Sequence, residues 1–317
     1  MCVYKIVYVK ALIDSSEGRF LCVSIMELEQ GGRERIVHNH VSKVGYVNGV
    51  INKRKKPYRR VKRSVIRVPR ALQELFVSCK DTFKSPATIP SPHHVQTLCR
   101  ILDDIKPEDV GLSRDLQFFK PGKNIIKENQ RVTYTTMYKC DNFSLCIFFL
   151  PESGVIPLHN HPGMTVFSKL LLGKMHIKSY DWVDELEAEV EVEAEASNNL
   201  MQQNSKVRLA KLKANRVLTA PCDTSVLYPT RGGNMHEFTA ITPCAVLDVI
   251  GPPYSKQHGR DCSYYKDHPY AAFSTNEEMD KGKEANVYWW LEEIEVPENS
   301  QMDGIEYLGP PIGEPSF

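Results

Sequence analysis

The sequence lacks any long apolar run. No stretch approaches the roughly 18 apolar residues that identify a membrane helix, so we expect no membrane partner. The first residues, Met1–Asp14, are interrupted by Lys5 and Lys10 and have no apolar signal-peptide core. An excess of one charge is also missing, since 40 basic residues face 39 acidic ones. Overall charge therefore indicates no nucleic-acid partner.

A disulfide framework is missing as well. The nine cysteines are an odd number and are scattered without regular spacing. Such a pattern is typical of a reduced, intracellular protein. The chain has 317 residues, of which 42% are hydrophobic, and this is enough for one large domain or two smaller ones.

Two amphipathic helices are predicted before residue 107. The first, Val68–Phe83, places its apolar residues on one face at helical spacing. Ser91 is expected to cap the second, with Pro92 at its first position, and Pro107 ends it. The two apolar stripes consist of Leu72, Leu75, Phe76, Cys79 and Phe83, and of Val95, Leu98, Cys99, Leu102 and Ile105.

From Val132 to about Ile250 the apolar pattern has a period of two, with a turn every 8–12 residues, which predicts an all-β sandwich or barrel. Within it, Val166–Leu172 and Met175–Trp182 are expected to form a hairpin that turns at Gly173-Lys174. The acidic insert at 184–206 reads as a solvated loop between strands.

His159 and His161 are the strongest candidates for chemistry. Side chains two residues apart in an extended chain point to one face, so both imidazoles can reach one metal ion. Pro157 precedes the pair, Pro162-Gly163 follows it, and a third histidine, His236, stands in a glycine-rich corner. The alternative is a solvated edge strand with no ligand.

The spacing also resembles the first cupin motif, G-x5-H-x-H-x4-E-x6-G, although one residue fewer follows Gly154. The position of the motif's glutamate is Val166, which cannot bind a metal. The site would then hold three histidines and no carboxylate. Three neutral imidazoles leave three open positions on one face of a six-coordinate ion, as in non-haem Fe(II) oxygenases.

A longer resemblance follows from these residues. The stretches SGVIPLHNHPGMTVFSKLL, RLAKLKANRVLTAPCDTSVLYP, GGNMHEFTAITPCAVLDVIGPPYS and GRDCSYYKDHPY are similar to the plant cysteine oxidases, which belong with the 2-aminoethanethiol dioxygenases. The resemblance covers about Arg63 to Ser274. It implies an all-β dominated, cupin-like double-stranded β-helix (jelly-roll) barrel, with the two N-terminal helices packed outside.

The same resemblance implies an activity. Fe(2+) would be held by His159, His161 and His236, and O2 would be the co-substrate. The N-terminal cysteine of proteins such as ethylene-response transcription factors would be oxidised to the sulfinic acid. That product marks the protein for degradation, so the enzyme would act as an oxygen sensor in the nucleus and cytoplasm. We expect a monomer, and the alternatives are a dioxygenase of a free small thiol and a non-catalytic ligand-binding cupin.

Two catalytic residues are also implied by the resemblance. Asp248 would bind the substrate ammonium or support a ligand, and the Tyr254 hydroxyl would reach bound oxygen or thiolate. Cys262 and Tyr264 are weaker candidates, since related enzymes can join such a pair covalently near the iron. Glu237 departs from the family pattern and would face either the metal or solvent.

The domain boundaries follow. We expect a partly disordered N-terminal extension at 1–63, the dioxygenase domain at 64–275, and a C-terminal segment at 276–317 that packs on the barrel or is partly flexible. Lys53–Arg63 has eight basic residues in eleven, which indicates a nuclear import signal or a nucleic-acid patch. The alternative is a plain solvated linker. The chain starts Met1-Cys2, and removal of Met1 would expose a cysteine of the substrate type.

Overall fold

The computed structural model describes residues 8–13, 20–25, 69–86, 88–119, 131–183, 207–272 and 287–313. The basic segment Lys53–Arg63, the acidic insert at 184–206 and Cys2 lie outside these residues. No described helix has the length and apolar character that crossing a bilayer requires. Two short strands near the start, β1 (Tyr8–Ile13) and β2 (Phe20–Ile25), pair antiparallel with each other.

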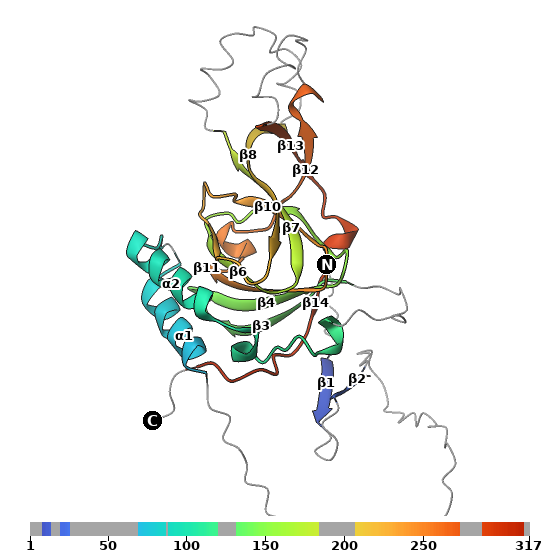
Figure 1. Cartoon of the computed structure of the whole chain (residues 1–317). Helices are drawn as coiled ribbons and strands as arrows, with labels where there is room; N and C mark the ends of the chain where they lie inside the picture. The colour runs from blue at the N-terminus through green and yellow to red at the C-terminus, as the bar shows by residue number, and fades with distance from the viewer. Residues whose placement is uncertain are drawn as a thin grey trace, which may run out of the picture.

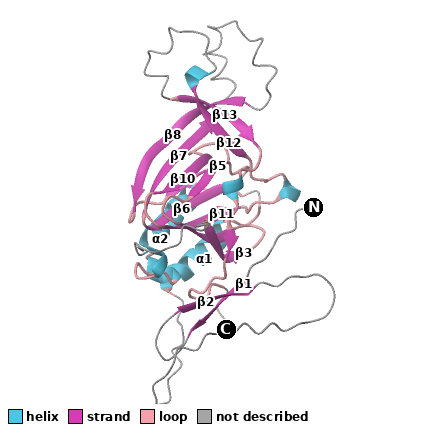
Figure 2. Ribbon diagram, turned by 90° about the vertical axis from the view of Figure 1, so that its right-hand side faces the viewer, coloured by secondary structure: helices cyan, strands magenta, loops and turns pink. Residues whose placement is uncertain are grey.

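Two β-structures, stacked in Figures 1 and 2, make up the body of the protein. One is a six-stranded sheet in the order β14-β3-β4-β11-β6-β9, and the other closes on itself in the order β10-β5-β12-β13-β8-β7. This is the cupin-like jelly roll that the sequence predicts. The sheet comprises β3 (Thr133–Lys139), β4 (Ser144–Leu150), β6 (Thr165–Leu172), β9 (Ser225–Leu227), β11 (Cys244–Gly251) and β14 (Asp303–Gly304). The closed barrel comprises β5 (Val155–His159), β7 (Lys174–Trp182), β8 (Val207–Thr219), β10 (Met235–Ala240), β12 (Tyr264–Pro269) and β13 (Tyr288–Ile294).

The two predicted helices are confirmed as α1 (Arg70–Thr82) and α2 (Pro92–Asp104), and both pack on the outer face of the sheet. The side chain of Ser91 caps α2 by accepting the backbone N–H of His94, and Pro92 is the first helical residue. A helical turn at Pro107–Val110 follows. Further single turns lie at Gln117–Phe119, Lys256–His258, Tyr270–Ala272 and Glu298–Ser300.

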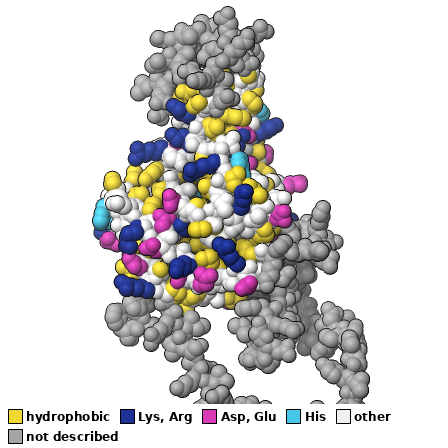
Figure 3. Space-filling model, viewed as in Figure 1, with side chains coloured by type: hydrophobic (Ala, Val, Ile, Leu, Met, Phe, Trp, Pro, Cys, Tyr) yellow, Lys and Arg dark blue, Asp and Glu magenta, His cyan; other side chains and the backbone are white. Residues whose placement is uncertain are grey.

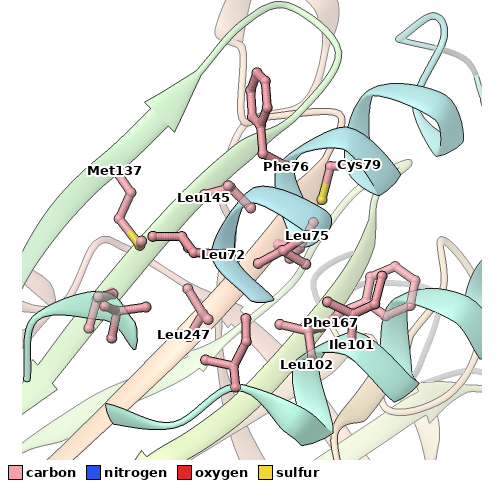
Figure 4. Packing of buried hydrophobic residues seen from close by; sticks show 14 of the residues in the cluster. Leu72, Leu75, Phe76, Cys79, Ile101, Leu102, Met137, Leu145, Phe167 and Leu247 are labelled. Atoms are coloured by element: carbon pink, nitrogen blue, oxygen red, sulfur yellow. The ribbon is translucent and has the colours of Figure 1, made fainter. Parts of the chain in front are cut away.

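The main hydrophobic core lies between the helices and the sheet. Figure 4 shows Leu72 and Leu75 of α1 in this layer, beside Leu247 of the central strand β11. These three side chains are fully buried, and each contributes about 1.5–3 kcal/mol by burial. The helices therefore anchor β11, which also carries the candidate residue Asp248.

The predicted hairpin between Val166–Leu172 and Met175–Trp182 is wrong. Strand β6 pairs with β11 and β9, whereas β7 pairs with β10 and β8. At Gly173 the chain passes from the sheet to the barrel with φ +94°, and a Cβ there would collide with the Pro243 carbonyl. A glycine turn between two apolar strands looks the same in the sequence whether the strands pair or separate.

The segment after residue 275 contributes to the barrel, because β13 lies between β12 and β8. Figure 3 shows the outer surface on one face, where basic and acidic side chains are interspersed over the described residues. Seven cysteines from residue 79 onward are free thiols: Cys79, Cys99, Cys140, Cys146, Cys222, Cys244 and Cys262.

Candidate metal centre

The three candidate histidines meet between the barrel and the sheet. His159 ends β5, His161 follows two residues later, and His236 pairs with His159 across the β10–β5 ladder. Their ring centroids lie 4.7–4.9 Å apart, and one ligand atom from each lies within 4.8 Å of the others. All three are buried, with exposures of 8, 3 and 4%.

Hydrogen bonds fix the orientation and tautomer of His159. Its Nδ1 lies 2.8 Å from the carbonyl oxygen of Pro157. A carbonyl only accepts hydrogen bonds, so Nδ1 must carry the proton. The lone pair that binds a metal is therefore on Nε2.

The ring of His161 is fixed by Tyr254. The Tyr254 hydroxyl lies 2.8 Å from the Asn160 carbonyl oxygen and 2.8 Å from His161 Nδ1. Because its single proton goes to the carbonyl, the hydroxyl accepts from Nδ1–H. The buried Nε2 of His161 has no hydrogen-bond partner among the described residues. A metal ion satisfies this otherwise costly unpaired atom.

His236 has the same kind of outer partner, because its ring hydrogen-bonds the backbone carbonyl of Gly233. Its other side stacks on Phe238, with centroids 4.5 Å apart. Metal-binding histidines usually give their second nitrogen to a carbonyl or a similar acceptor, which fixes the ring. All three rings follow this rule, so the structure fits a metal ion.

Burial keeps the three imidazoles neutral. It lowers the pKa of His159, and it lowers the pKa of His161 and His236 well below the usual value, with a further lowering from the neighbouring rings. Neutral imidazole is the form that binds a metal. Among the described residues no carboxylate belongs to this cluster. Val166, at the position of the cupin glutamate, is buried with Met164, Leu227 and Ile250.

The metal-free protein is expected to lose stability as the pH falls below 6.5, the ordinary pKa of histidine. Since the folded pKa values are lower, the unfolded chain takes up protons first, and the free energy of unfolding decreases with falling pH. Each ligand contributes about 1.4 kcal/mol per pH unit in this range. Melting temperatures of the metal-free protein at pH 7.5 and 5.5 measure the effect.

His161→Gln removes one of these titrating imidazoles and should reduce the change in melting temperature between pH 7.5 and 5.5. The control is His176→Gln, at a strand position where the ring bonds Asn215 Oδ1 at 2.7 Å and not the cluster. Equal changes in wild type and His161→Gln would contradict the assignment of neutral, buried ligands.

Asp248 lies on the central strand β11 and is 6% exposed. Ser168 on the paired strand β6 is its hydrogen-bond partner, while its buried Oδ1 has none among the described residues. Burial raises its pKa to about 7. Ser168 also lines a cavity that His236 lines. The Asp248 carboxylate is therefore connected to this cavity through its hydrogen bond to Ser168.

The Tyr254 hydroxyl hydrogen-bonds one of the ligands, His161, and the carbonyl of Asn160. It supports His161, as described above, and its pKa is raised well above the usual value by burial and by Cys262. The thiol of Cys262 hydrogen-bonds both Tyr254 and Tyr264, and burial raises its pKa to about 11. The Tyr264 ring lies 6.4 Å from His159, so the weaker candidates also border the centre.

Tyr254→Phe is expected to weaken metal binding about 10-fold or more, the range for losing an outer partner of a ligand. The change leaves a buried N–H of His161 unpaired. Metal affinity by competition with a chelator measures it. The control, Tyr264→Phe, removes a hydroxyl whose partners are Cys262 and Ser300. Unchanged affinity in Tyr254→Phe would show that the hydroxyl does not orient the ligand.

Glu237 faces away from the metal centre. Alternate residues of a strand point to opposite faces, and Glu237 follows His236 on β10. It pairs with Lys178 of β7, and its pKa is raised by burial and by Asp267. The sequence left two orientations open for Glu237, toward the metal or toward solvent, and the structure rules out the first.

Three supporting residues escaped the sequence analysis. Asn160, between two ligands, accepts the Ser263 N–H through Oδ1 at 2.8 Å. Asn234, two residues before His236, bonds the backbone of His161. Its place in a glycine-rich corner was a usable signal. Asp181 had no recognisable signal in the sequence, because its hydrogen-bond partners are 51–53 residues away.

The chain is similar to two groups of known enzymes over most of its length. The family model described as PCO_ADO matches residues 101–312. Plant cysteine oxidase 2 of Arabidopsis thaliana is 48% identical over 266 residues, which cover 83% of this chain and 90% of that protein. The 2-aminoethanethiol dioxygenase of Homo sapiens is 29% identical, over 70% of this chain and 82% of that protein. A solved cupin superfamily protein from Desulfitobacterium hafniense aligns with 10% identity and a TM-score of 0.26, over 42% of this chain and 94% of that one.

Proposed function

We propose that this protein oxidises the N-terminal cysteine of proteins. The chain belongs to the PCO_ADO family, which comprises the plant cysteine oxidases and the 2-aminoethanethiol dioxygenases, and it is a thiol dioxygenase. A thiol and O2 give a sulfinate and one proton, with both oxygen atoms on sulfur. His159, His161 and His236 would hold the iron(II) ion.

One observation carries the proposal: three neutral imidazoles present their lone pairs to one point, with no carboxylate among the described residues there. Bound iron(II) would supply the redox chemistry that joins O2 to a thiol. Such a ligand set brings no negative charge of its own, so a substrate thiolate can supply it. The three rings are buried, and the outer hydrogen bonds hold them in place without the metal.

The buried carboxylate of Asp248 favours the proposal of a substrate that carries an ammonium group. An N-terminal cysteine has both a thiol and an ammonium, separated by two carbon atoms. A carboxylate behind Ser168 can balance that charge directly or through Ser168. Free cysteine and cysteamine have the same pair of groups, so a free small thiol is the competing substrate class.

The substrate class is tested by aerobic incubation of the iron-loaded protein with a Cys-initiated peptide, free cysteine and cysteamine. Mass spectrometry should show a gain of two oxygen atoms on the peptide, and faster turnover of it than of the small thiols. The same peptide with an acetylated N-terminus is the matched control and should stay unmodified. Faster oxidation of cysteine or cysteamine would assign the small-thiol function instead.

The non-catalytic alternative is tested in the same reactions. A ligand-binding cupin would hold metal without consuming O2 in the presence of any of the three thiols. Oxygen uptake that matches sulfinate formation one to one supports the dioxygenase. Metal binding with no oxygen uptake would overturn it.

The proposed protein substrates are ethylene-response transcription factors that begin with cysteine. The similarity to Plant cysteine oxidase 2 supports proteins with an N-terminal cysteine as substrates, and these factors are our proposal within that class. Oxidation would direct these factors to degradation through the N-degron pathway, so that low oxygen preserves them. The proposal is tested with synthetic N-terminal peptides of such factors, compared with the same peptides carrying Ser in place of Cys.

We also propose that the enzyme works in both nucleus and cytoplasm, with Lys53–Arg63 as the import signal. Deleting this segment, which contains none of the three histidines, is expected to reduce nuclear accumulation and leave peptide oxidation unchanged. Fluorescence of a tagged protein measures the distribution. The control deletes an equally long stretch within 26–50. An unchanged nuclear fraction would make the segment a plain linker.

A further inference from the structure

The loop between β9 and β10, which delivers His236, is held by a single carboxylate. Asp181 on β7 accepts three consecutive backbone N–H groups: Gly232 at 2.8 Å through Oδ2, and Gly233 at 2.8 Å and Asn234 at 3.0 Å through Oδ1. Gly232 and Gly233 both have positive φ, +86° and +84°. This left-handed backbone is readily accessible to glycine, and it aims successive amides at one acceptor.

Gly233 also fits tightly against β7. A Cβ at this position would lie 2.6 Å from Ser179 Oγ, and Ser179 is the register partner of His236. The loop therefore lies directly on the strand that carries Asp181. Its position is set by backbone hydrogen bonds and close contact at the same time.

Asn234 connects this loop to His161, another of the three ligands. Its Oδ1 accepts the backbone N–H of His161 at 3.1 Å, and its Nδ2 donates to the His161 carbonyl at 2.9 Å and the Tyr228 carbonyl at 2.8 Å. The amide thus bonds both backbone groups of one ligand while its own N–H is held by Asp181. A continuous chain of bonds runs from Asp181 through Asn234 to His161.

Both residues are buried, with exposures of 7% for Asp181 and 6% for Asn234. The nearest described cation is Lys213, whose Nζ lies 3.8 Å from Asp181 Oδ2. Buried polar groups are costly unless they are bonded, and here several partners are backbone groups that cannot rotate away. Neither side chain belongs to the cluster of ligands.

We propose that Asp181 and Asn234 are positioning residues that fix His236 relative to His159 and His161. They set the spacing of the metal ligands in the metal-free protein, so the site is formed before the metal arrives. This inference rests on the proposed metal site. It predicts that breaking the chain of bonds weakens metal binding and changes the coordination geometry while the fold remains.

The test uses Co(II), whose visible absorption reports coordination number and geometry, titrated into the full metal-free chain. In Asp181→Asn the side-chain NH2 faces backbone N–H groups, so at least one of three bonds is lost. We expect a dissociation constant 10–100-fold higher than that of wild type and a changed Co(II) spectrum. Asn234→Ala should give the same changes by removing the link to His161.

The matched control is Asp103→Asn. Asp103 also receives three hydrogen bonds on its carboxylate, from Lys169 Nζ at 2.9 Å and from the backbone and hydroxyl of Thr224 at 2.8 and 2.7 Å. These partners are not metal ligands. The control should lower the melting temperature of the metal-free protein but keep the Co(II) affinity and spectrum of wild type.

The double variant Asp181→Asn/Asn234→Ala separates one chain of bonds from two independent supports. If Asp181 and Asn234 belong to one chain of bonds, the double variant should have nearly the same Co(II) dissociation constant as the single variant that binds Co(II) less tightly. The effects of substitutions at coupled sites are not additive. Asn234→Ala leaves the Asp181 carboxylate and its glycine partners in place. If Asp181→Asn gives no folded protein, the Co(II) affinity and spectrum of Asn234→Ala alone test the positioning role.

The outcomes are distinct. Wild-type affinity and spectrum in folded Asp181→Asn and Asn234→Ala would overturn the positioning role and leave the metal site intact. Equal losses in Asp103→Asn would also overturn it, since general destabilisation would then explain the result. A wild-type chain that binds no Co(II) would overturn the proposed metal site together with this inference.

Discussion

Replacing His236 by alanine is expected to remove most of the bound metal and all measurable thiol oxidation. The substitution leaves two of three imidazoles in a cluster that has no carboxylate among the described residues. The loss of metal affinity should exceed the 10–100-fold range for outer partners of ligands. His159→Ala should behave in the same way, because its ring supplies an equivalent nitrogen.

Metal content by elemental analysis and sulfinate formation by mass spectrometry measure the effect. The control is His176→Ala, which removes a histidine from β7 whose partner is Asn215. It should keep both metal and activity. Wild-type turnover in His236→Ala would remove His236 from the site.

Asp248→Asn is expected to keep the metal but to lower turnover of a Cys-initiated peptide by 10–100-fold, the range for groups that support a metal site. The carboxylate is buried, has one unpaired oxygen, and has a pKa raised to about 7. Asparagine keeps the shape and removes the charge that would balance a substrate ammonium. Since a buried charge with few partners is costly, stability should stay level or rise as activity falls.

The pH dependence of the wild type should reflect this group. A raised pKa means that Asp248 takes up a proton as the pH falls through about 7, so turnover should decline below that pH, and the asparagine variant should lack this decline. The control Asp267→Asn removes a carboxylate that bonds Lys178 and Tyr180. Equal turnover in Asp248→Asn and wild type would make Asp248 a structural residue.

The sequence predicted the three histidines of the cluster, and for two of them the reason is local. The two-residue spacing of His159 and His161 places both rings on one side of an extended chain. The lack of a carboxylate follows directly from Val166 at the cupin glutamate position. The helices α1 and α2 were likewise predictable from apolar spacing, Ser91 and Pro92.

Other features depended on pairing between distant segments. The strands on either side of Gly173 separate into two different β-structures, and no local signal distinguishes this from a hairpin. Glu237 remained ambiguous until its register partner Lys178 on β7 and the effect of the Asp267 carboxylate on its pKa were known. The hydrogen bonds of the Tyr254 hydroxyl with Asn160 and His161 were also not predictable, because they join residues 93 and 94 positions apart.

What the sequence by itself determined is the chemistry available here: three histidines, a jelly-roll pattern of strands and the family to which the chain belongs. The tertiary structure alone decided how those histidines are held. Asp181 meets its loop partners from 51–53 residues away, and Asn234 meets His161 from 73 residues away. Contacts at such separations arise from strand register and closure of the barrel, and neither is encoded within a short stretch of residues.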